Sequence, residues 1–184
     1  MVNFPKGIYF LTGSTFLHYP YFKLEEQKDI VLRQIQKLKK DKGIQICAFS
    51  IQMNHYHILF YAKRETDVAT VKQYMNGGTS FVYNKIYKKK YTNMWGTMKT
   101  IRVWNEQMYW KIIGYVNGNL LKHREVGTFE ELYETEFSSY KYFVEKYGHD
   151  MMKEIIYKVV DVGESAEGEV GVEGLKNLKV KIPI

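Results

Sequence analysis

The sequence has a single cysteine, Cys47, among its 184 residues. One cysteine cannot form an intramolecular disulfide, and it cannot supply the several thiolates of a structural zinc site. Cys47 lies in the apolar stretch ICAFSI, where we expect it to behave as a small hydrophobic residue. A disulfide framework and a thiolate metal cluster are therefore excluded.

Long hydrophobic runs are also missing. The chain contains no stretch of about 18 consecutive apolar residues, so we expect no membrane-spanning helix and no membrane partner. Residues 1–16 lack the charged start, the apolar core and the small-residue cleavage site of a secretory leader. The cytoplasm, a reducing compartment, is the simplest expectation for such a chain.

The composition is otherwise that of a soluble domain, with two exceptions. The net charge is +7, and aromatic residues reach 16%, including 16 tyrosines. A basic protein favours polyanions, because each phosphate it neutralises releases a condensed counterion. Aromatic rings add stacking platforms for unpaired bases, each worth roughly 1–3 kcal/mol. Composition alone leaves two readings open, namely nucleic-acid binding and a basic protein with a tyrosine-rich core.

Hydrophobic periodicity and turn signals predict elements in the order β-α-β-β-α-β-α. Residues 44–52 and 55–62 are strand-like runs separated only by Met53-Asn54, which predicts a tight antiparallel hairpin. Asn105 is a good N-cap for a helix over 106–122. The other predicted elements are a strand at 7–16, a helix at 24–41 ending at Gly43, a helix from 66 that Gly77-Gly78 interrupts, and a strand at 97–104. This order predicts an α+β, ferredoxin-like two-layer sandwich with a central antiparallel sheet.

The rest of the chain divides into two further segments. We expect the core domain to span residues 1–125 and a helical extension packed on it to span residues 126–160. Residues 161–184 are rich in glycine and acidic residues at their start, which is typical of a tail.

A pair of histidines provides the strongest chemical signal. His55 and His57 stand two residues apart in a predicted strand, so they share a face and lie about 6–7 Å apart along it. Two imidazoles in that arrangement can chelate one metal ion. Taken alone, such a triplet is also typical of structural histidines, but a polar pair at the start of a central strand is hard to explain by packing. His18, His123 and His149 show no ligand spacing with the pair, and we expect them at the surface.

The predicted helix 106–122 offers two more candidates. Tyr115 and Asn119 are four residues apart and therefore share a helix face. Asn119 can give an amide oxygen to a hard cation, and Tyr115 a phenolic oxygen. Gly114 and Gly118 weaken this helix, for which we expect a reason such as close approach of DNA or a movable helix. A tyrosine beside Ile112 is equally typical of a core position.

Three segments together resemble a known family. They are MNHYHILF, then FVYNKIYKK followed by MWGTMKT, and finally YVNGNLLKHREV. They resemble the HUH-superfamily single-tyrosine transposases, and in particular the branch of REP-associated tyrosine transposases. The family's histidine–hydrophobic–histidine motif falls on His55, Tyr56 and His57, and its tyrosine and polar metal-site residue fall on Tyr115 and Asn119. The resemblance covers about residues 7–143.

The resemblance implies a ferredoxin-like fold, Mg²⁺ or Mn²⁺ as cofactor, and hairpin-forming single-stranded DNA as partner. It implies that His55, His57 and Asn119 hold the metal and that Tyr115 is the nucleophile that forms a 5′-phosphotyrosine. Members act as monomers or as homodimers. This chain departs from the branch at Leu120, where a proline is usual, and at the loop STFLHYPYF, which replaces a loop with glycine and arginine.

A lysine- and tyrosine-rich segment is the candidate DNA-tracking surface, although a solvated helix face has the same pattern. It comprises Lys85, Lys88, Lys89, Lys90, Tyr83, Tyr87 and Tyr91. Two other functions fit the sequence. One is a non-catalytic module that binds single-stranded nucleic acid on a ferredoxin-like sheet. The other is a metal-dependent hydrolytic nuclease in which water replaces the tyrosine.

Overall fold

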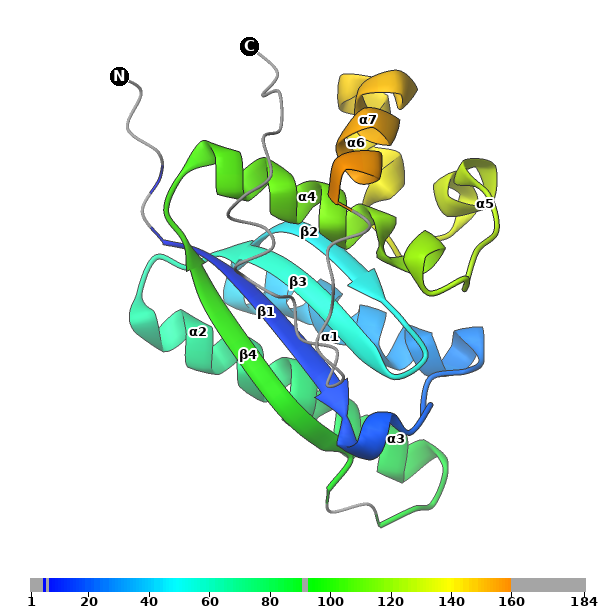
Figure 1. Cartoon of the computed structure of the whole chain (residues 1–184). Coiled ribbons are helices and arrows are strands. Elements are labelled where there is room, and N and C mark those ends of the chain that lie inside the picture. Colours follow the sequence, from blue (N-terminus) through cyan, green and yellow to red (C-terminus); the bar gives the residue numbers. More distant parts are fainter. Residues whose placement is uncertain (1–4, 6, 91–92, 160–184) are drawn as a thin grey trace.

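The computed structural model describes residue 5, residues 7–90 and residues 93–159. Its centre is one antiparallel sheet with the strand order β2-β3-β1-β4 (Figure 1). The strands are β1 (Ile8–Thr15), β2 (Gln45–Ile51), β3 (His55–Tyr61) and β4 (Trp95–Val103). This order places β3 and β1 in the middle of the sheet. The ferredoxin-like α+β fold predicted from the sequence is therefore confirmed.

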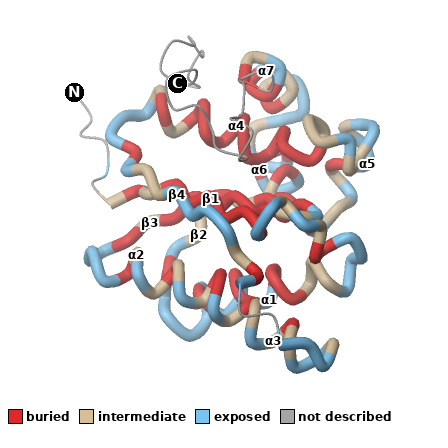
Figure 2. Tube along the Cα trace, turned by 60° about the horizontal axis from the view of Figure 1, so that its bottom comes forward, coloured by how far each residue is buried: buried red, intermediate tan, exposed pale blue. Residues whose placement is uncertain are grey.

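One face of the sheet is covered by the helices that connect its strands (Figure 2). They are α1 (Glu25–Lys42), α2 (Glu65–Lys72) and α3 (Thr79–Ile86), and a short 3₁₀ turn, Phe16–His18, precedes them. Gly43 ends α1 in a left-handed conformation with φ 64°, as a C-cap glycine does. The predicted break at Gly77-Gly78 is wrong, because Gln73–Gly78 form a π-helical turn that joins α2 to α3 without leaving the helix.

The other face carries the second half of the chain. It is covered by α4 (Glu106–Lys122), and α5 (Phe129–Glu134), α6 (Tyr140–Tyr147) and α7 (His149–Val159) follow (Figure 1). The Asn105 side chain accepts a hydrogen bond from the backbone N–H of Met108 at 2.7 Å, so the predicted N-cap of α4 is confirmed.

The glycines of α4 serve helix packing. A Cβ atom on Gly114 would lie 2.6 Å from Cγ2 of Ile155, and one on Gly118 would lie 2.7 Å from Cγ2 of Ile156. Both glycines therefore let α7 approach the α4 backbone. The expectation that they admit DNA or make the helix movable is corrected accordingly.

Burial is heaviest along the central strands. Six of the seven residues of β3 are buried, and only Tyr61 is partly exposed (Figure 2). Tyr56 faces the helices α1–α3, where its hydroxyl donates to Oδ1 of Asn76 at 2.6 Å. Its ring occupies the space beside Gly13, where a Cβ atom would lie 2.5 Å from the ring. The large residue between the two histidines is thus accommodated by a glycine on the neighbouring strand.

Two further expectations concern the C-terminal tail and membrane-spanning helices. The predicted tail, residues 161–184, lies outside the described residues. Within the described part of the chain, no helix has the length and apolarity needed to cross a bilayer.

Candidate functional site

The two histidines lie side by side under α4. Strand alternation turns His55 and His57 to the α4 face of the sheet, with ring centroids 5.0 Å apart. Both side chains are buried. Nδ1 of His55 is 2.7 Å from Oδ1 of Asn54, and Nδ1 of His57 is 2.9 Å from Oγ1 of Thr12. Each Nδ1 thus has an oxygen neighbour that orients its ring, as the second shell of a metal site does.

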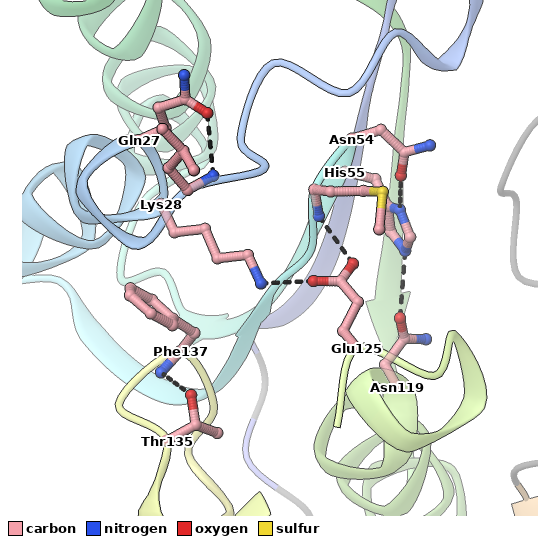
Figure 3. Close-up of polar contacts among 10 residues, drawn as sticks. Gln27, Lys28, Asn54, His55, Asn119, Glu125, Thr135 and Phe137 are labelled. Carbon is pink, nitrogen blue, oxygen red and sulfur yellow. Dashed lines mark hydrogen bonds and ion pairs between the residues drawn. The ribbon is translucent and has the colours of Figure 1, made fainter. Parts of the chain in front are cut away.

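His55 also reaches across to helix α4 (Figure 3). Its Nε2 lies 3.1 Å from Oδ1 of Asn119. Because the amide oxygen of Asn54 can only accept, Nδ1 of His55 carries the proton in the neutral ring, and Nε2 presents a lone pair. Nε2 of His55 and the amide oxygen of Asn119 thus lie close enough to contact one cation together.

Tyr115 completes the cluster. Its side chain is 1% exposed, and its ring centroid lies 5.1 Å from that of His57 and 6.4 Å from that of Phe10. The ammonium of Lys122 lies 5.2 Å from the centre of the same ring. The structure therefore brings His55, His57, Tyr115 and Asn119 into one buried cluster between β3 and α4.

His123 also belongs to this neighbourhood, contrary to the expectation of a surface position. Its ring centroid is 4.7 Å from that of His55, and the residue caps the C-terminus of α4. The signal in the sequence was its spacing of four from Asn119, which continues the helix face. Among the described residues, no three His, Cys, Asp or Glu side chains are grouped so that they could hold a metal. The amide oxygen of Asn119, 3.1 Å from Nε2 of His55, is a further oxygen beside the two imidazoles.

A buried ion pair supports the turn before His55. Oε1 of Glu125 accepts from the backbone N–H of Met53 at 2.8 Å, and Oε2 pairs with the ammonium of Lys28 (Figure 3). The side chains of Lys28 and Glu125 are 12% and 5% exposed. This contact joins α1, the β2–β3 turn and the segment after α4, so it holds the start of β3 against the end of that helix.

The predicted DNA-tracking surface needs one correction. Lys85, Lys88, Lys89 and Lys90 are exposed, and Tyr87 is partly buried. Tyr83 is only 7% exposed, because its ring packs edge-on against Tyr21 and Phe22. It belongs to the core and cannot offer its face to a base. Tyr91 lies outside the described residues.

Comparisons with known proteins were made at the level of families, sequences and structures. The family model of IS200-like transposases matches residues 18–123, which is more than half of the chain. No curated protein sequence matches. A solved REP-associated tyrosine transposase bound to a REP hairpin is 18% identical, with a TM-score of 0.66 over 92% of this chain and 94% of that one. A candidate transposase from Deinococcus radiodurans R1 is 15% identical, with a TM-score of 0.47 over 64% and 94% of the two chains. The likeness to the first structure shows a shared fold.

Proposed function

The chain belongs to the family of IS200-like transposases, and we propose that it cuts and rejoins single-stranded DNA through a covalent bond to Tyr115. We place it in the REP-associated tyrosine transposase branch. One observation carries this proposal. The ring of Tyr115 lies against His57 in the same cluster where Asn119 meets Nε2 of His55. A nucleophile and a set of metal donors are thereby held together on two rigid elements.

The donor set fits Mg²⁺ or Mn²⁺, which His55, His57 and Asn119 would hold. With each Nδ1 beside an oxygen, Nε2 is the ring nitrogen that would bind a metal in both histidines. Neighbouring ligands of an octahedral ion at about 2.1 Å are about 3 Å apart, and His55 Nε2 and Asn119 Oδ1 are 3.1 Å apart. When bound, the ion would polarise the scissile phosphate and stabilise negative charge on its oxygens.

The residues of the chain perform the covalent step. The phenolic oxygen of Tyr115 attacks phosphorus, the bond to the 3′ oxygen breaks, and a 5′-phosphotyrosine forms. The departing 3′ oxygen ends as a hydroxyl, so it gains the proton that the phenol loses. A free tyrosine has a pKa near 10, so the phenol needs activation, which a metal ion bound next to it would supply. Since Tyr115 is 1% exposed, its oxygen must become accessible before a phosphate can reach it.

Rejoining is the reverse of this step. The phosphotyrosine bond retains the energy of the phosphodiester, so a second 3′-hydroxyl can attack it and join two strands without ATP. The exposed Lys85, Lys88, Lys89 and Lys90 would track the DNA backbone. The hairpin bound to the REP-associated structure supports a hairpin-containing single strand as the substrate. The proposal applies to a monomer and to a homodimer alike.

A gel assay tests the proposal. The wild-type chain, Tyr115→Phe and the control Tyr140→Phe are incubated with Mn²⁺ and a labelled pool of single-stranded hairpins with randomised flanks. Tyr140 is a suitable control because it is also fully buried but lies in α6. We expect a denaturant-resistant protein–DNA adduct in the wild type and in Tyr140→Phe, and none in Tyr115→Phe.

The other outcomes separate the alternatives. Cleavage without an adduct that survives in Tyr115→Phe would establish a hydrolytic nuclease. Metal-independent binding with neither cleavage nor adduct would establish a nucleic-acid-binding module.

A further inference from the structure

The segment after β1 exposes large apolar side chains beside the site. Phe16, Leu17 and Tyr19 are 49%, 82% and 58% exposed. We call these three residues the β1-loop platform. Clustered apolar surface of this kind marks places where a protein binds a partner. The proposed chemistry uses none of these residues.

The backbone of the platform is strained and yet held firmly. Leu17 and His18 both have φ 52°, in the left-handed region that side chains other than glycine rarely adopt. Hydrogen bonds fix the segment on both sides. The hydroxyl of Thr15 donates to the carbonyl of Tyr19 at 2.7 Å, and the N–H of Phe16 donates to the carbonyl of Met94 at 2.9 Å. Strain of this kind persists only where the surroundings impose it, and it clusters at ligand-binding segments.

Asn54 joins the platform to the metal ligands. Its Oδ1 lies 2.7 Å from Nδ1 of His55 (Figure 3). Its Nδ2 donates to the carbonyl of His18 at 3.2 Å. The backbone carbonyl of Asn54 also accepts from Thr15 at 2.8 Å. One side chain, that of Asn54, therefore connects the platform to the first histidine.

The chemistry of the segment suits unpaired bases. Residues 15–24 contain no acidic residue, and the exposed Lys23 follows the platform. Tyr19 packs against Tyr21 with centroids 4.7 Å apart, and Tyr21 packs against Tyr83 at 5.7 Å. This support holds the Tyr19 ring in place, so that little side-chain freedom is lost when a base stacks on it.

We propose that Phe16, Leu17 and Tyr19 bind unpaired nucleobases of the DNA strand that enters the site, by stacking and apolar contact. The choice of DNA rests on the proposed function. The lysines after α3 would hold phosphates, whereas the platform would hold bases, so the two surfaces respond differently to removal of the bases.

The test measures equilibrium binding of the full chain, in EDTA, to a labelled mixed-sequence single strand. Tyr19→Ala removes a platform ring. Tyr142→Ala is the matched control, because Tyr142 is 57% exposed and lies on α6. Leu17→Gly removes the side chain at a position whose positive φ suits glycine, so the fold is preserved. We expect Tyr19→Ala and Leu17→Gly to weaken binding about fivefold or more, as the loss of one stacked base does, and Tyr142→Ala to bind as the wild type does.

A strand with abasic sites provides the second measurement. If the platform holds bases, the wild type and the Tyr19→Ala variant should bind the abasic strand equally. Equal affinities of the wild type and all three variants for the intact strand would overturn the proposed base contact. This holds even where the wild type forms a covalent adduct in the gel assay. Weaker binding by the platform variants without any adduct would retain the platform and reject the proposed strand transfer. A loss that persists on the abasic strand would overturn base contact.

Discussion

Nε2 of His55 and Oδ1 of Asn119 face each other at 3.1 Å, from the middle of a sheet and from the helix that covers it. The two residues are 64 positions apart in the sequence, and both are buried. Because a strand and a helix each hold one of them, the separation of the two atoms is set by the packing of α4 on the sheet. If the proposed metal site is correct, its affinity for the ion should therefore depend on that packing.

Replacing Asn119 should weaken metal binding selectively. Partners that only orient a ligand are worth about 10–100-fold in metal affinity, so we expect Asn119→Ala to lose at least that much Mn²⁺ affinity. The control is Asn117→Ala, since Asn117 is equally buried in α4 but accepts a hydrogen bond from Ser139. That control should lose stability, by about 1–3 kcal/mol, and keep its affinity. Electron paramagnetic resonance of free Mn²⁺ measures the affinity of each variant, and urea denaturation measures its stability. Equal Mn²⁺ affinities of the two variants would contradict the ligand role of Asn119.

Thr12 should act on the metal through His57. Its hydroxyl orients Nδ1 of that ring, and Thr12→Val removes the contact while it nearly preserves the volume. We expect a fall in Mn²⁺ affinity of roughly tenfold or more. The matched control is Thr100→Val on β4, because the Thr100 hydroxyl is buried without a hydrogen-bond partner among the described residues. Titration calorimetry should find the control unchanged. A similar loss in both variants would mean that the effect comes from the sheet and not from His57.

Alanine at the glycines of α4 should destabilise the protein, although helix propensity alone predicts that Gly→Ala stabilises a helix. Gly114→Ala would place Cβ 2.9 Å from the backbone oxygen of Ile155, which cannot move aside as a side chain can. We expect a loss of about 1–3 kcal/mol in the free energy of unfolding, which is typical of overpacking. Gly77→Ala is the control, since its Cβ would meet nothing within 4 Å, and alanine there should stabilise by up to about 1 kcal/mol. Urea denaturation measures both, and a stabilised Gly114→Ala would refute the packing role.

The fold could be predicted because its signals are local. The strand-like run at 55–62, the turn at Met53-Asn54 and the cap at Asn105 each involve only neighbouring residues, and all three are present in the structure. The transposase family could also be predicted from the sequence, because its motifs are short and contiguous, and the family model confirms it. The prediction that Gly77-Gly78 interrupt the helix was wrong. The helix continues there as a π-helical turn, which depends on the packing around it and not on the glycines themselves.

The surroundings of the site could not be predicted in the same way. Thr12 meets His57 only because β1 pairs with β3 in one register, and no local pattern encodes that register. Tyr83 shares a helix with lysines and so resembled a surface residue, but the rings that bury it come from a loop about 60 residues earlier. His123 was missed because its neighbour His55 lies on a different element.

Cys47 should react slowly with alkylating reagents. Burial raises the pKa of its thiol to about 11, so at pH 8 only about one molecule in a thousand carries the reactive thiolate. Raising the pH toward 11 should increase the rate of iodoacetamide labelling steeply while the fold is intact, and unfolding in urea should increase it at pH 8. Mass spectrometry follows both rates. Rapid labelling of the folded protein at pH 8 would show that the thiol is not desolvated.

The ion pair between Lys28 and Glu125 should matter most for stability when it is broken on one side. Glu125→Ala leaves the largely buried ammonium of Lys28 without its partner and removes the acceptor of the Met53 N–H. Removing one partner of a buried pair costs about 3–5 kcal/mol. The double variant Lys28→Met, Glu125→Leu should recover part of this loss, because it leaves no unpaired charge. Urea denaturation of Lys28→Met, of Glu125→Leu and of the double variant measures the coupling. Additive losses would show that the pair contributes nothing beyond its separate contacts.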